Sequence, residues 1–351
     1  MSIIAAIVIF SVIVLFHEFG HFTLARACGV EVLEFSLGMG PRLLSHVSKK
    51  SHTRYSLKLL PFGGSCLMKG EDTDDMSPGA FGTKKVWQRI LIVAAGPVFN
   101  FVLAFLFAAV IIGSAGYDAP VPEYVAEDSP MAMAGVAAGD EITSLDGRRI
   151  TIYRDIVNYA TFVLDDRVPG SRIPVEWVHD GKPMSAEIAL KSTNGSLASV
   201  LGIYGGGRFS AHGNVLVILR YAAYEVKYWI GTTLSSLGMI GRGRVSLDDV
   251  SGPVGIVGVI SDTYRETRKE GAFMLFLNML NMAILLSANL GVMNLLPFPA
   301  LDGGRIVLLI IEQIRRKKLG DNIEAYINLA GFAVLMGIMV FVMFNDVRKL
   351  L

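Results

Sequence analysis

VLFHEFGHFTLA, at residues 14–25, places two histidines and a glutamate inside an apolar run. An ionisable side chain at membrane depth costs roughly 3 kcal/mol or more, so it is tolerated there only with a partner or a chemical role. Within residues 2–24, His17, Glu18 and His21 are the only ionisable side chains. The run reaches the roughly 20 residues that a bilayer crossing needs, and it lacks the basic start and cleavage site of a signal peptide. We therefore predict a retained membrane span that carries a chemical site.

The three residues are spaced as an HExxH motif. On a helix, side chains four positions apart share a face, so the His17 and His21 imidazoles can bind one zinc ion with Glu18 beside them. The alternative is that each histidine is a core imidazole bonded to a backbone carbonyl. Lipid disfavours that alternative, because an apolar helix offers few polar partners and three unpaired groups would cost too much.

The composition is that of a membrane protein. Hydrophobic residues fill 52% of the 351 positions, charged residues only 18%, and the mean hydropathy is +0.50. An ordinary soluble domain is less apolar and more charged. A net charge of +1 argues against a nucleic-acid partner, which needs a basic face. We expect Cys28 and Cys66 to be reduced thiols without a disulfide.

We predict about four membrane crossings by helices, with both protein ends on the same side. After the first span, three apolar regions cover residues 90–116, 273–311 and 327–344. Each region is long enough to cross the lipid bilayer.

The distribution of basic residues predicts the orientation. Lys and Arg gather between residues 26 and 89 and again in RRKK at 315–318, and such residues favour the cytoplasmic side. Both termini and the polar block at 117–270 are then extracytoplasmic, in a multi-pass protein of the cell membrane. His17 lies about 24 Å along a helix from Met1, which places the site in the inner half of a hydrocarbon core about 30 Å thick.

The polar block contains one small domain. Residues 121–191 have strands bounded by Gly and Asp turns with a short helix, and they resemble a PDZ domain of the bacterial protease type. Whether this domain captures peptides or acts as a steric filter stays open. The apolar stretch 215–240 is interrupted by charges and is expected to lie in the membrane interface, since a fifth crossing would put RRKK outside. These boundaries divide the chain into two parts of a membrane core, a PDZ-like domain and extracytoplasmic interfacial helices, at residues 1–116, 272–351, 117–195 and 196–271.

A catalytic zinc needs a third protein ligand and an open position for water. Asp302 is the only carboxylate among the polar residues that interrupt the later apolar regions as far as residue 302. It follows Pro297 and Pro299, which should break the helix and let irregular backbone line a cavity. The alternative is that Asp302 only caps a helix.

Residues 54–72 predict a β-hairpin. Tyr55, Leu57 and Leu59 alternate with polar residues before a turn at 61–64, and SCLMK follows. The alternative to a membrane-associated loop is a plain cytoplasmic hairpin.

Two asparagines are candidates for supporting roles. Asn294 could bond a substrate backbone or oxyanion, or only its own broken helix. In the second span, Gly96 and Pro97 should bend the helix, and Asn100 is expected to serve packing across helices rather than chemistry.

Five features together resemble the site-2 protease family of intramembrane zinc metalloproteases, in particular the bacterial regulator of sigma-E protease type. They are the PDZ-like insert and the motifs HEFGH at 17–21, GPVFN at 96–100, SGPVGI at 251–256 and NLLPFPALDGG at 294–304. The resemblance covers nearly the whole chain. It implies an α-helical polytopic membrane protein with an inserted extracytoplasmic PDZ-like α/β domain and a membrane-associated β-hairpin that offers an edge to substrate.

The resemblance also implies an activity. Zinc would be held by His17, His21 and Asp302, with Glu18 as catalytic base. The substrates would be single-span membrane proteins such as anti-sigma factors or remnant signal peptides, cut within the membrane after a first cleavage trims their outer domain. A metal transporter would need ligands along a route through the bilayer, and the sequence offers one cluster. A catalytically dead scaffold is disfavoured because Glu18 and every expected ligand are present.

Overall fold

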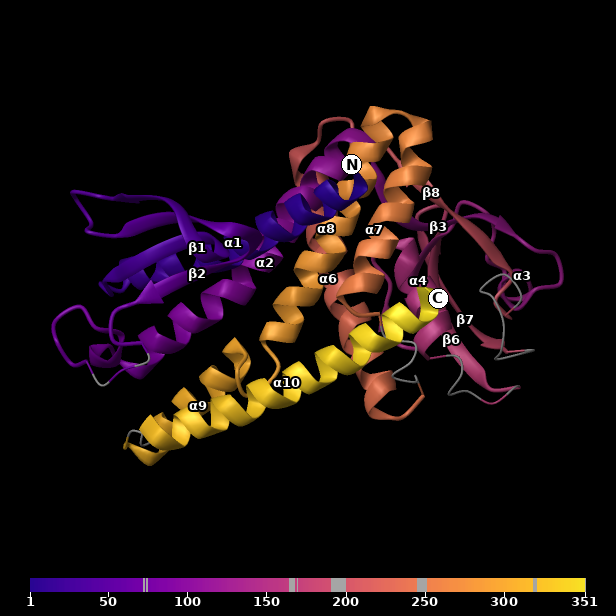
Figure 1. Ribbon diagram of the computed structural model, residues 1–351. Coiled ribbons are helices and arrows are strands. Elements are labelled where there is room, and N and C mark those ends of the chain that lie inside the picture. Colours follow the sequence, from indigo (N-terminus) through magenta and orange to yellow (C-terminus); the bar gives the residue numbers. More distant parts are fainter. Residues whose placement is uncertain are drawn as a thin grey trace. The chain divides into compact units, whose positions relative to one another are not determined.

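The computed structural model describes residues 1–71, 73, 75–163, 168, 170–190, 200–244, 251–317 and 321–350 (Figure 1). The chain divides into two compact units. The first combines Met1–Phe107 with Val245–Leu351, and the second comprises Ala108–Arg244. Two stretches that are far apart in the sequence therefore build the first unit, which contains the predicted zinc site.

Four helices in the described part of the chain are long and apolar enough to cross a membrane, as predicted. They are α1 (Ser2–Ala27), α2 (Val86–Ala115), α8 (Ala272–Asn294) and α10 (Asp321–Leu350). The expected break in the third apolar region is confirmed. Helix α8 ends at Asn294, and α9 (Asp302–Arg315) begins only after the stretch that contains Pro297 and Pro299.

Two apolar clusters hold the helices of the first unit together. One joins α1, α2, α8 and α7 (Pro253–Thr267), which is followed by the short η4 (Arg268–Glu270). Its buried members are Ala6, Ile9, Ile13, Leu103, Ile260 and Ala283. The other joins the ends of α1, α2 and α9 to the segment around η1 (Phe81–Thr83), and its buried members include Ala25, Phe81, Ile92, Val93 and Leu309. Their burial fixes the helix α9 that carries Asp302 against the helix that carries the histidines.

Helix α1 is followed by a β-hairpin. It consists of β1 (Val32–Val47) and β2 (Arg54–Met68), which pair antiparallel with several register shifts. Because both strands bend, residues 34–37 align with residues 54–57 and also with residues 64–67. The segment 34–37 therefore has neighbours on both sides, and the segment 64–67 pairs on one side only within the part of the chain that the structure describes.

The predicted pairing of this hairpin is wrong. The turn expected at 61–64 would have joined two strands that pair with each other, whereas both flanking segments pair with residues 34–37 of β1. Glu34 and Ser36 are buried in β1, whereas the apolar residues that alternate with them, Leu33, Phe35 and Leu37, are more exposed. Glu34 is tolerated there because Arg42 donates two hydrogen bonds to it at 3.0 and 2.8 Å, and these hold the pKa of its carboxyl at about 2.

The second unit contains the PDZ-like domain and one long helix. Its elements are β3 (Tyr117–Val125), α3 (Pro130–Ala134), β4 (Glu141–Leu145), β5 (Arg148–Arg149), α4 (Tyr153–Phe162), β6 (Arg172–His179), β7 (Lys182–Ala189), β8 (Ile203–Phe209) and α6 (Val215–Gly241). Strands β5, β4, β6 and β7 form one sheet in that order, and β3 pairs with β8. The core of the domain surrounds Trp177, whose side chain is almost fully buried.

Helix α6 covers the apolar stretch that we expected in the interface. It is not among the four helices that are apolar enough to span a membrane. Two of the charges that interrupt it bind the PDZ-like domain: Glu225 accepts a hydrogen bond from Arg154, and Lys227 donates one to Thr151 at 3.2 Å. Apolar side chains such as Leu216 stay exposed.

Candidate metal centre

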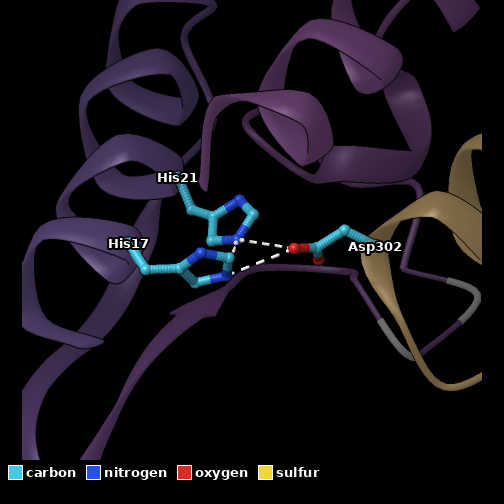
Figure 2. A group of neighbouring side chains, drawn as sticks. All are labelled: His17, His21 and Asp302. Atoms are coloured by element: carbon cyan, nitrogen blue, oxygen red, sulfur yellow. Dashed lines mark hydrogen bonds and ion pairs between the residues drawn. The ribbon is translucent and has the colours of Figure 1, made fainter. Parts of the chain in front are cut away.

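The structure brings His17 and His21 together with Asp302, which lies 281 residues after His21 in the sequence (Figure 2). The two histidines project from consecutive turns of α1, and Asp302 lies in the first turn of α9. His17 Nε2 lies 3.2 Å from both His21 Nε2 and Asp302 Oδ2, and His21 Nε2 lies 3.7 Å from the same carboxylate oxygen. One potential ligand atom from each residue thus faces a common point.

The donor set fits a zinc ion. His21 Nδ1 faces the Ile92 carbonyl oxygen at 2.9 Å, and since a carbonyl can only accept, Nδ1 carries the proton of the neutral ring and Nε2 presents a lone pair. Asp302 Oδ2 is buried without a hydrogen-bond donor among the described residues. Lone pairs that converge in a buried place repel one another unless a cation lies between them. Two imidazole nitrogens and one carboxylate oxygen are the ligands of a catalytic zinc with one position left for water.

Gly96 of α2 makes room for both imidazoles. A Cβ at this position would lie 2.3 Å from His21 Nε2 and 2.7 Å from His17 Cε1. At Gly20, a Cβ would lie 2.4 Å from the Ala95 carbonyl oxygen. The HExxH face of α1 therefore packs directly on the backbone of α2, and only glycine permits this contact.

Asp302 is held in place by contacts around α9. Cβ atoms at Gly303 and Gly304 would lie within 2.2 Å of backbone oxygens from the preceding break, so this segment folds tightly onto the helix start. Arg305 donates to the Glu71 carboxylate at 2.6 Å.

A second ion pair holds α9 against α2. Arg89 forms a bidentate pair with Glu312 at 3.1 and 2.6 Å, and its side chain is only 8% exposed. This pair was not predicted from the sequence, although Glu312 ends an otherwise apolar run at 306–312, which indicates that it needs a partner.

Glu18 is half-buried and lies next to β2. A Cβ at Gly64 would be 3.1 Å from Glu18 Cγ. Residues 64–67 of β2 therefore pass directly beside the Glu18 side chain. Burial raises the pKa of the nearby Cys66 thiol and the Glu18 charge adds to the effect, which disfavours the thiolate.

The remaining predicted residues take different positions. Asn294 ends α8 with its Nδ2 3.5 Å from His17 Nε2, so it joins the cluster. Pro299 packs against α10, where a Cβ at Gly331 would lie 2.4 Å from it. The Tyr55 ring packs near Phe22 in α1.

Two of the predicted hairpin residues lie outside residues 64–67, the segment of β2 that passes beside Glu18. Leu57 pairs with both Leu37 and Leu44, in a part of β2 that has neighbours on both sides. Leu59 follows it and is exposed.

A family model and curated relatives match this chain over most of its length. The family model described as peptidase family M50 matches residues 5–338. A predicted zinc metalloprotease from Clostridium acetobutylicum is 34% identical, with 99% of this chain and 97% of the relative covered. The regulator of sigma-W protease RasP from Bacillus subtilis is 29% identical, with 99% of each covered. Among solved structures, the PDZ domain of an SdrC-like protein from Listeria monocytogenes matches 22% of this chain and 75% of its own, with 26% identity and a TM-score of 0.19.

Proposed function

Because this chain belongs to peptidase family M50, the site-2 protease family, and is a multi-pass membrane zinc metalloprotease, we propose that it cleaves single-span membrane proteins within their transmembrane segments. The observation that carries this proposal is the convergence of His17, His21 and Asp302, with two of these ligands on a helix long enough to span a membrane. A hydrolytic centre on such a helix suits a substrate that is itself in the bilayer.

His17, His21 and Asp302 are the proposed zinc ligands, and Glu18 is the proposed general base. A zinc ion held by these residues would supply a Lewis acid for the scissile carbonyl and would lower the pKa of bound water. The Glu18 carboxylate takes a proton from the attacking water molecule and passes it to the leaving amine. Its position, one residue after a ligand and outside the ligand set, supports this role.

The substrate must be extended before it can be cut, because a transmembrane helix hides its carbonyls in its own hydrogen bonds. We assign the holding of the extended chain to residues 64–67 of β2, which pair on one side only and pass beside Glu18. An added strand gains affinity from main-chain hydrogen bonds without demanding a sequence. Asn294 then bonds the substrate backbone near the reacting carbonyl.

The biological setting is part of the proposal. The substrates are anti-sigma factors or remnant signal peptides whose outer domain has been removed by a first protease, and the PDZ-like domain filters by size or binds the trimmed end. Both termini face outward and the site lies in the inner half of the bilayer. The name of the Bacillus subtilis relative, a regulator of sigma-W protease, supports a substrate of the anti-sigma type.

Cleavage of a tagged single-span model substrate by the purified full chain in detergent tests the proposal. We compare wild type, Glu18→Gln, Asp302→Asn and the control Glu127→Gln, an exposed glutamate of the second unit, and count zinc in each. We expect Glu18→Gln to lose cleavage and keep zinc, Asp302→Asn to lose cleavage and bind zinc weakly, and the control to resemble wild type. Cleavage that survives Glu18→Gln contradicts the mechanism.

A further inference from the structure

Asn100 lies behind one of the two proposed histidine ligands. Its side-chain amide is 3.1 Å from His17 Nδ1, the ring nitrogen that points away from His21 and Asp302. Asn100 is completely buried in α2. The backbone of Asn100 is also fixed. Ser287 Oγ of α8 donates a buried hydrogen bond to the Asn100 carbonyl oxygen at 2.8 Å and holds this part of α2 against α8.

Proton accounting decides what Asn100 must do. A neutral imidazole carries one ring proton, and the nitrogen that binds a metal must be free of it. If His17 Nε2 is a ligand, Nδ1 carries the proton and needs an acceptor. An amide nitrogen cannot accept, so an Asn100 Nδ2 that faces Nδ1 would select the tautomer that cannot bind a metal through Nε2.

The other end of the amide resolves this conflict. Asn100 Oδ1 is buried and has no hydrogen-bond partner among the described residues. The two ends of a carboxamide have nearly the same shape, so its orientation is decided by its hydrogen-bond partners. Rotating the amide by half a turn places Oδ1 against His17 Nδ1, which gives both of these atoms a partner, and moves Nδ2 to the position that Oδ1 leaves.

We propose that Asn100 is a positioning residue whose side-chain oxygen accepts a hydrogen bond from His17 Nδ1 and holds His17 in the metal-binding tautomer. This inference rests on the ligand set of the proposed function. It assigns to Asn100 a role towards the metal in place of the packing role expected from the sequence.

His21 has the matching arrangement. The Ile92 carbonyl accepts from its Nδ1 at 2.9 Å, so α2 orients both imidazoles from the side opposite to the metal point. The difference is that Ile92 contributes a backbone atom, which substitution does not remove. A substitution at Asn100 can therefore remove the hydrogen-bond acceptor of His17 while the backbone of α2 is kept.

Zinc affinity of the metal-free full chain in detergent, measured by competition with a chelator, tests this role. We compare Asn100→Leu, which removes the acceptor, with Asn100→Asp, which keeps an oxygen at the same place. Asn278→Leu makes the same change on α8, where the amide bonds only the Met274 carbonyl of its own helix. Loss of an acceptor behind a ligand histidine typically weakens metal binding by about 10- to 100-fold.

We expect that loss in Asn100→Leu, and affinities close to wild type in Asn100→Asp and Asn278→Leu. Equal zinc affinity in Asn100→Leu and wild type would overturn the inference, as would equally weak binding by Asn100→Leu and Asn100→Asp when both melt like wild type. If Asn100→Leu does not fold, ring-nitrogen NMR of metal-free wild type replaces it, with His17→Gln to assign the signal. A proton on His17 Nδ1 supports the proposal, and a proton on Nε2 refutes it.

One further variant separates this inference from the proposed function. If His17→Ala binds zinc as wild type does, the ligand set is wrong and the proposed function fails with it. If His17→Ala loses zinc while Asn100→Leu keeps it, only the role of Asn100 fails.

Discussion

Replacing Gly96 by alanine should separate metal binding from folding. The new methyl group would lie 2.3 Å from His21 Nε2, 2.6 Å from His21 Cε1 and 2.7 Å from His17 Cε1. An ordinary contact begins at 3.4 Å, so the His21 ring must move by about 1 Å. His21 cannot make this move freely, because its Nδ1 is hydrogen-bonded at 2.9 Å to the carbonyl oxygen of Ile92, which lies in α2 with Gly96.

The expected loss is large. Metal–ligand distances in a working site vary by only about 0.2 Å, and a displacement of about 1 Å in a catalytic group can cost on the order of 100-fold in rate. We expect Gly96→Ala to bind zinc at least about 100-fold more weakly and to lose cleavage of the single-span substrate to the same degree or more.

Stability should change less than metal binding. Alanine in a helix interior is favoured over glycine by about 1 kcal/mol, which offsets part of the roughly 1–3 kcal/mol that an overpacked contact costs, so the free energy of unfolding of the metal-free protein should change less than the free energy of zinc binding. Gly113→Ala is the matched control on α2, since a Cβ there meets only Ile218, at 3.5 Å. Zinc binding by Gly96→Ala that equals that of Gly113→Ala would refute the close packing of α1 on α2.

Three further changes probe the surroundings of the site and the PDZ-like domain. Arg89→Met should lower the free energy of unfolding in detergent by about 3–5 kcal/mol, because it leaves Glu312 buried without its partner, and Glu312→Leu added to it should restore most of the loss. Asp346→Ala should speed hydrogen exchange at the start of α7 and cost about 2 kcal/mol, since Asp346 accepts from two backbone N–H groups there, at 3.1 and 2.8 Å. The hydrogen bond to Asp140 raises the pKa of His179, so its contribution to stability is complete below about pH 6.5 and is lost as the pH rises through the raised pKa. Amide hydrogen exchange in β6 should therefore be slower in wild type than in His179→Gln at low pH, and this difference should vanish at high pH. A difference that does not depend on pH would contradict this prediction.

The chain's membrane spans and its HExxH face were predictable because both depend on local spacing. A run of about 20 apolar residues needs no knowledge of the rest of the chain, and two histidines four positions apart share a helix face wherever the helix lies. Asp302 could be selected by elimination, since few carboxylates interrupt the later apolar regions. The proposed metal ligands were therefore accessible from the sequence.

The hairpin pairing was not accessible in the same way. Residues 54–57 and 64–67 both have strand character, but their common partner, residues 34–37, contains Glu34 at a buried position. A glutamate within a strand argues against burial until its partner is known, and here Arg42 comes from another part of β1. Pairing over such a distance depends on tertiary contacts that a local pattern does not contain.

The role of Asn100 shows the same limit from another side. A single polar residue in an apolar span can serve packing or chemistry, and the choice depends on which face of α2 meets α1. The structure settles that face through Gly20, whose lack of a side chain lets the α2 backbone at Ala95 approach closely. Once α1 is in contact there, Asn100 necessarily lies behind His17.

Helix α2 thus contributes as much to the proposed centre as the helix that carries the motif. Ile92, Gly96 and Asn100 follow one another at intervals of four residues, so they line one face of α2 over two turns. Ile92 and Asn100 contact the back of one imidazole each, and Gly96 leaves the space in which both rings meet. The HExxH spacing alone brings two rings to one face, but it fixes neither their tautomers nor their tilt. It follows that Gly96 and Asn100 of GPVFN act together with His17 and His21 of HEFGH, and that loss of the space at Gly96 or of the acceptor at Asn100 should be read out first in metal affinity.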